Sequence, residues 1–133
     1  MSNPNIFPAV RYRDAAAALD WLTKAFGFDE VVVNHNDDGS VGHAELRLGS
    51  GMIMLGPSAG DGWLGGGMPD PLASPISIYV VVDNPKEHYE RAMAHGARIV
   101  RELETMDYGS TEYSARDLEG HLWSFGSYDP YVS

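Results

Sequence analysis

The sequence predicts an α+β protein built from two copies of one βαβββ unit. Asp14 and Gly27 bound an amphipathic helical stretch, and Asp83 and Gly96 bound a second stretch of the same length. A short apolar run precedes each stretch, and three strand-like runs follow it. Because a repeat of this kind decides the architecture, the chain is predicted to form two curved mixed sheets, one per copy.

The first repeat is predicted over 5–56, beginning with a strand over 6–12. Asp14 follows that strand and suits a helix start, since its carboxylate can accept amide hydrogens of the first turn. Apolar residues then recur at helical spacing up to Phe26, and Gly27 supplies the left-handed stop. Three strands are predicted next, over 31–33, 41–48 and 52–56, with a hairpin turn at Asp38-Gly39.

The second repeat is predicted over 76–128 in the same order. A β-forming run over 76–82 precedes Asp83 and Asn84, either of which can cap the helix. Pro85 fits the first helical turn, and the helix is predicted to reach His95. Three strands follow, over 98–101, 111–116 and 121–127, with a turn at 117–120 before the last.

A Gly- and Pro-rich stretch over 57–75 joins the repeats and carries Trp63, Leu64 and Met68. A connection of this length in a compact domain is either a linker or a binding lid, and its apolar residues favour a lid. Together the segments are predicted to form a single domain over 1–133.

Composition excludes several classes of function. With nine basic and nineteen acidic residues the net charge is -10, which argues against nucleic-acid binding. No apolar run is long enough to span a membrane, and the absence of cysteine excludes disulfides and thiolate metal sites. The N-terminal residues carry no signal-peptide pattern, so a cytoplasmic protein is expected.

The architecture itself predicts where a ligand would bind. One helix covers only one face of a four-stranded sheet, and soluble proteins avoid leaving the other face bare. Two such units that curl their open faces together would form a concave, partly apolar trough. Such a trough is the kind of surface that binds small molecules.

Several stretches resemble the glyoxalase / bleomycin-resistance / extradiol-dioxygenase (vicinal oxygen chelate) superfamily. They are the two Asp-to-Gly spacings, His43–Gly49 and Arg116–Trp123, and the similarity extends over roughly the whole chain. The closest resemblance is to small bacterial glyoxalase-like proteins. It implies a homodimer, whose repeats pair within one chain or are exchanged between chains. It also implies, for the enzymes of the group, a divalent metal held by His and Glu from four strands.

This chain departs from that metal site. The positions that correspond by spacing are Phe7, Met54, Ser77 and Ser124, and none offers the imidazole or carboxylate that the site requires. We therefore expect no metal and no other cofactor. The metal-free, drug-sequestering members of the family become the nearer analogy.

Strand alternation predicts which side chains line the trough. If Met54 points inward, Met52 does too, whereas Ile53 and Leu55 point toward the helix. A turn near Ser50-Gly51 would pair Leu46 with Leu55 and Leu48 with Ile53. The predicted ligand-binding set is Phe7, His43, Glu45, Arg47, Met52, Met54, Trp63, Ser77, Tyr79 and Ser124. Alternatively, the charged members face solvent or a partner subunit, or pair with one another.

Aromatic residues offer further candidates for stacking on a planar ligand. These are Trp63, Tyr108, Tyr113 and Tyr128, for which core or interface packing is the alternative.

Three functions remain open on the sequence. The first is a metal-independent binding protein that sequesters an aromatic or cationic compound. The second is a lyase, isomerase or dioxygenase-like enzyme with a relocated metal, or with His43 and Glu45 as a catalytic acid-base pair. The third is a purely structural or regulatory dimer with an empty, collapsed trough. We favour the first.

Overall fold

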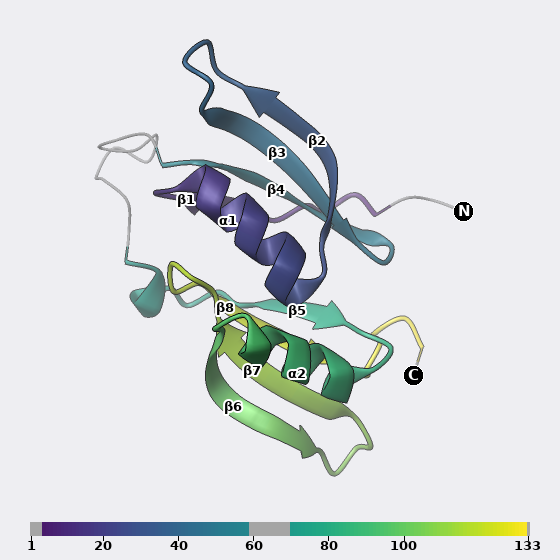
Figure 1. The fold of residues 1–133 in the computed structure, drawn as a ribbon. Helices are drawn as coiled ribbons and strands as arrows, with labels where there is room; N and C mark the ends of the chain where they lie inside the picture. Colours follow the sequence, from purple (N-terminus) through teal and green to yellow (C-terminus); the bar gives the residue numbers. More distant parts are fainter. Residues whose placement is uncertain (1–3, 59–69, 133) are drawn as a thin grey trace. The chain divides into compact units, whose positions relative to one another are not determined.

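The computed structural model describes residues 4–58 and 70–132 and divides into two compact units, Met1–Pro69 and Asp70–Ser133 (Figure 1). Each unit holds one helix and one four-stranded mixed sheet, so the α+β class and the two βαβββ repeats are confirmed. That both repeats form a single domain stays a prediction. Within the described part of the chain, neither helix is long and apolar enough to cross a membrane.

The first unit forms a sheet in the order β1-β4-β3-β2. β1 runs parallel to β4, and the remaining neighbours are antiparallel. The helix α1 continues directly into one π-helical turn. The elements are β1 (Ala9–Tyr12), α1 (Ala15–Trp21), the π-helical turn (Leu22–Phe26), β2 (Asp29–His35), β3 (Val41–Leu48) and β4 (Gly51–Pro57).

The second unit repeats this plan in the order β5-β8-β7-β6, with β5 parallel to β8. A 3-10 turn over Pro71–Ala73 comes before its first strand. The elements are β5 (Ile78–Val81), α2 (Pro85–Ala94), β6 (Arg98–Thr105), β7 (Thr111–Arg116) and β8 (Leu122–Gly126).

Both helices begin and end where the sequence predicts. The Asp14 side chain accepts a hydrogen bond from the Ala17 amide at 3.0 Å, and Asn84, rather than Asp83, accepts one from Glu87 at 3.1 Å. Such caps satisfy amide hydrogens that have no partner inside the helix. Gly27 and Gly96 follow the ends of the helices with φ angles of 82° and 85°. Residues that carry a Cβ rarely adopt these positive φ values.

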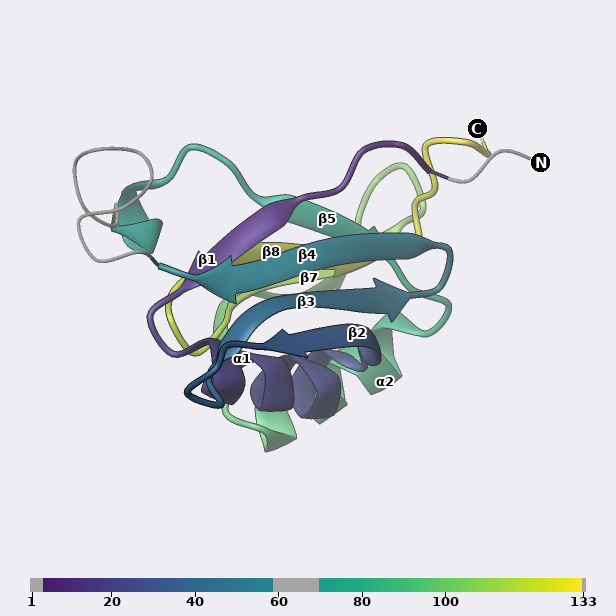
Figure 2. The same ribbon diagram turned by 90° about the horizontal axis from the view of Figure 1, so that it is seen from above.

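Each helix covers one face of its own sheet. In the first unit α1 contacts β1, β3 and β4, and Figure 2 shows α1 lying along one side of this sheet. In the second unit α2 contacts β6 and β7, and the His88 ring lies 4.1 Å from that of Phe125. The sheet residues buried on these helix-facing sides include Val10, Tyr12, Ala44, Leu46, Ile53 and Leu55 in the first unit and Tyr113, Ala115, Trp123 and Phe125 in the second.

The strand boundaries differ from prediction at the sheet edges. β1 and β5 are shorter than expected, so Phe7 and Ser77 lie just before their strands, whereas β2 and β6 are longer. Pro57 belongs to β4 rather than to the connection between the repeats. Residues 59–69, including Trp63, lie outside the described residues, and the lid stays a prediction.

The predicted register of β3 with β4 is wrong by two residues. Leu48 pairs with Gly51, so Leu46 lies opposite Ile53 and not opposite Leu55. The turn is confined to Gly49-Ser50, where Gly49 takes a φ of 62°. Because side chains alternate with a period of two, a two-residue shift leaves every side chain on its predicted face.

The turn between β7 and β8 is built around one buried carboxylate. Asp117, 6% exposed, accepts hydrogen bonds from the amides of Glu119 and His121 at 3.0 and 3.1 Å. Its second oxygen accepts one from Trp123 Nε1 at 3.0 Å. This single side chain therefore joins the turn to the core.

Replacing Asp117 with alanine should destabilise the protein by about 2–4 kcal/mol, because three donors lose a charged acceptor. Urea denaturation followed by tryptophan fluorescence measures the change. Asp107→Ala, at an exposed turn position, is the matched control and should change the free energy of unfolding by less than about 0.5 kcal/mol. Equal effects of the two substitutions would contradict this role.

Candidate functional site

The face of the first sheet that α1 leaves uncovered carries a row of polar and thioether side chains. Glu45 lies directly opposite Met54 on the neighbouring strand, and Arg47 lies opposite Met52. Directly paired residues share a face, and their neighbours Ala44, Leu46 and Ile53 are buried, so this row points away from the helix. The sequence prediction that these side chains share one face is thus confirmed.

Two residues of this row form a hydrogen-bonded pair. His43 Nε2 lies 2.9 Å from Glu45 Oε2, and both side chains are half-buried. A carboxylate only accepts, so Nε2 carries the hydrogen, and in the neutral imidazole Nδ1 then keeps its lone pair. The pair can orient a ligand or accept its proton.

The second sheet carries a different row at equivalent positions. β7 pairs with β8 as β3 pairs with β4, which places Glu112, Ser114 and Arg116 where the first sheet has His43, Glu45 and Arg47. Sequence reasoning missed Glu112 and Ser114. The alternation of buried Tyr113 and Ala115 with polar residues was the signal that could have found them.

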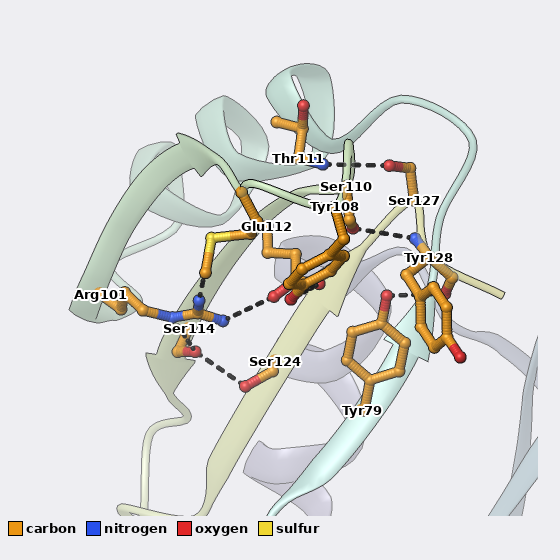
Figure 3. A network of polar contacts seen from close by, with 11 residues as sticks. Tyr79, Arg101, Tyr108, Ser110, Thr111, Glu112, Ser114, Ser124, Ser127 and Tyr128 are labelled. Carbon is orange, nitrogen blue, oxygen red and sulfur yellow. Dashed lines mark hydrogen bonds and ion pairs between the residues drawn. The ribbon is translucent and has the colours of Figure 1, made fainter. Parts of the chain in front are cut away.

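Glu112 is the centre of a polar network on this second open face (Figure 3). Its carboxylate accepts hydrogen bonds from Arg101 Nη2 at 3.2 Å and from the Tyr108 hydroxyl at 2.9 Å. Burial alone would raise the pKa of Glu112, but the hydrogen bonds from Tyr108, Ser110 and Arg101 outweigh it and lower that pKa. The carboxylate is therefore charged at neutral pH despite being 6% exposed.

Two further tyrosines lie beside this carboxylate. The Tyr79 hydroxyl donates to the Tyr128 carbonyl oxygen at 2.7 Å, and the Tyr108 and Tyr128 rings meet edge to face at 6.1 Å. Burial, followed by the nearby charge of Glu112, raises the pKa of Tyr79. Of the predicted aromatic candidates, Tyr108 and Tyr128 are exposed, whereas Tyr113 is fully buried in the core.

The positions that correspond to the family's metal site carry poor metal ligands in both units. Met54 lies opposite Glu45, and Ser124 shares a hydrogen bond of 2.7 Å with Ser114. A thioether and hydroxyls are poor ligands for a hard divalent ion. Among residues 4–58 and 70–132, no three His, Asp or Glu side chains are grouped to hold a metal. Metal independence stays a prediction.

Acid should weaken the protein through Glu112. Because its pKa is lower in the folded state, its stabilising contribution is present above its unfolded pKa and is lost as pH falls through the folded value. Glu112→Gln should therefore cost more stability at pH 7 than at pH 3, measured by chemical denaturation at both values. Glu90→Gln, exposed on α2, is the control that should show no such difference.

Comparison with known proteins identifies relatives that match this chain over most of its length. An uncharacterised protein of Mycobacterium bovis is 32% identical over 126 residues, covering 92% of this chain and 82% of the relative. The crystal structure of TioX from Micromonospora sp. ML1 is 31% identical with a TM-score of 0.74, covering 92% of this chain and 94% of TioX.

A bleomycin-binding protein, solved in complex with bleomycin, has the same fold. It is 22% identical with a TM-score of 0.66, covering 95% of this chain and 99% of that protein. The family model for the Glyoxalase/Bleomycin resistance protein/Dioxygenase superfamily matches residues 7–125. The duplicated βαβββ plan, the relatives and this match agree, and the chain belongs to the glyoxalase/bleomycin resistance protein/dioxygenase superfamily.

Proposed function

We propose that this protein binds a small organic molecule without a metal, holding an aromatic or cationic compound against the open faces of its sheets. The observation that carries the proposal is the uncovered face of the first sheet. There, half-buried Met52 and Met54 lie beside a His43–Glu45 pair whose hydrogen bond is satisfied internally. Such a surface offers adaptable apolar contact together with a few oriented polar groups.

Charge and family support the same function. The net charge of -10 attracts cationic compounds to the protein. A structural relative of the same superfamily was solved with bleomycin bound.

A homodimer and residence in the cytoplasm remain predictions of the sequence. Light scattering coupled to size-exclusion chromatography tests the homodimer.

Ligand binding should perturb the two methionines of the open face. In the full chain labelled with ¹³C at the methionine methyls, a bound compound should shift the Met52 and Met54 signals and leave Met93, exposed on α2, unchanged. Suitable probes are bleomycin, acridine orange as a planar cation and anilinonaphthalene sulfonate as a planar anion.

Met54→Ala should weaken binding of the probe by roughly 5- to 30-fold, because a buried thioether contact is lost. Met93→Ala should leave the affinity unchanged. If none of the probes shifts the Met52 or Met54 methyl, or if both alanine variants behave alike, the proposal is wrong.

A second candidate is an acid-base enzyme, which the 2.9 Å contact between His43 and Glu45 favours. In this reading His43 Nδ1 removes a proton from a carbon next to a carbonyl, and Glu45 holds the imidazole in the tautomer that accepts it. The imidazolium exchanges this proton with water and then returns a proton to carbon or to oxygen of the substrate. No redox partner is needed.

Exchange with deuterated water tests the second candidate. The wild-type protein should accelerate loss of the carbon-bound hydrogens of dihydroxyacetone in D2O, measured by proton NMR. Glu45→Gln should slow the catalysed exchange by about 100-fold. Glu30→Gln, on the exposed edge strand β2, should leave it unchanged. Exchange no faster than the uncatalysed rate rules this candidate out.

A further inference from the structure

The carboxylate of Glu112 is unusual among the acidic groups of the described chain. Its side chain is buried, yet it lies on the sheet face that α2 does not cover, because its neighbour Tyr113 contacts that helix. Arg101 approaches Oε1, and the Tyr108 hydroxyl approaches Oε2. Each oxygen therefore has a donor, and Ser110 adds a further hydrogen bond to the carboxylate. Arg101 and Tyr108 are held very differently.

Arg101 is anchored from several directions. It comes from β6, and besides Glu112 its guanidinium contacts Ser114 Oγ at 3.3 Å and Met106 Sδ at 3.8 Å. Its side chain is half-buried. The Arg101–Glu112 contact is thus part of the sheet and is not readily replaced.

Tyr108 is held mainly by its hydroxyl. It belongs to the turn between β6 and β7, in which the Gly109 N–H donates a hydrogen bond to the Met106 carbonyl oxygen. Tyr108 is 64% exposed. A side chain so exposed gains little from burial, so its hydroxyl remains the main attachment. A ligand donor that reached Glu112 Oε2 could replace that hydroxyl at small cost.

The surroundings of Glu112 suit one type of donor. Tyr79 and Tyr128 lie beside the Tyr108–Glu112 contact in Figure 3, and Tyr128 donates its amide hydrogen to Ser110 Oγ at 3.0 Å. Aromatic rings next to a carboxylate attract organic cations through their electron-rich faces as well as through charge. Arg101 already neutralises one charge locally, but the net charge of -10 still favours a cation over an anion.

Gly126 provides the room that this arrangement needs. It lies opposite Glu112 on β8, and its backbone has no positive φ that would itself require glycine. A Cβ at Gly126 would come within 2.7 Å of both Glu112 Cγ and the Tyr79 hydroxyl. The glycine therefore lets these two side chains cross the strand and approach each other.

From these contacts we propose that Glu112 anchors a protonated amine carried by an aromatic ligand, and that the Tyr108 hydroxyl occupies this anchor until the ligand displaces it. The proposal rests on the proposed function and specifies the ligand class at one of its open faces. The ammonium group of the ligand donates a hydrogen bond to Glu112 Oε2, and the aromatic part of the ligand contacts Tyr79 and Tyr128.

A pair of isosteric probes tests the ligand class on the full chain. 2-Phenylethylamine is protonated at neutral pH, whereas 2-phenylethanol has a neutral donor in the same place. Calorimetric titration should show about tenfold tighter binding of the amine, because a charged donor to a carboxylate makes the stronger bond. Equal affinities would overturn the assignment to amines, and tighter binding of the alcohol would assign the anchor to neutral donors.

Variants test the anchor and its placeholder separately. Glu112→Gln should weaken amine binding by about tenfold, whereas the control Glu90→Gln on α2 should not change it. Tyr108→Phe keeps the ring but removes the competing hydroxyl, so it should tighten amine binding by about threefold or more. A structural role for Tyr108 would leave the affinity unchanged or weaken it, which contradicts the proposal.

The Tyr108→Phe result remains decisive if Glu112→Gln does not fold, since it leaves the Arg101–Glu112 pair intact. Failure of the inference differs from failure of the proposed function. If bleomycin or acridine orange shifts the Met52 and Met54 methyls but the amine and the alcohol bind alike, only the amine anchor is wrong. If no compound binds, both are wrong.

Discussion

The whole structure depends on one constraint: each four-stranded sheet has a single helix, which can cover only one of its two faces. Strand alternation then separates the side chains of each sheet into two groups. Residues such as Leu46 and Phe125 are buried on the helix-covered side, whereas Glu45 and Glu112 lie on the opposite side. Every polar group proposed here to meet a ligand belongs to that opposite side, which the helix leaves free for chemistry.

The two repeats keep one backbone plan and diverge on the open face. Gly56 and Gly126 occupy matching positions next to the parallel edge strands, opposite Arg11 and Val81. A Cβ at Gly56 would meet the Arg11 guanidinium, whereas one at Gly126 would meet Glu112 and Tyr79. Both glycines are needed for space, but different side chains use that space. Duplication has preserved the scaffold while the chemistry of the two faces has separated.

The sequence predicted most of the fold because its signals are local. Asp14 and Gly27 mark a helix through groups within a turn of each other, and β3 and β7 follow alternation within a single strand. Predictions failed where a boundary depends on a neighbouring strand. β6 extends to Thr105 because β7 pairs with it there, and the β3–β4 register follows from the two-residue turn at Gly49-Ser50. Neither pairing produces a signal in the local sequence of the strand itself.

Sequence alone determined the duplicated plan, the face on which His43, Glu45, Met52 and Met54 lie, and the lack of metal-binding side chains at Phe7, Met54, Ser77 and Ser124. Periodicity and residue chemistry suffice for these conclusions. Only the tertiary structure showed that Arg101, Tyr108 and Glu112 form one network and that Gly126 makes room for it. These residues come from two strands, the turn that joins them and a third strand. Their contacts arise only when β6, β7 and β8 align, because a hydrogen bond depends on the positions of both atoms.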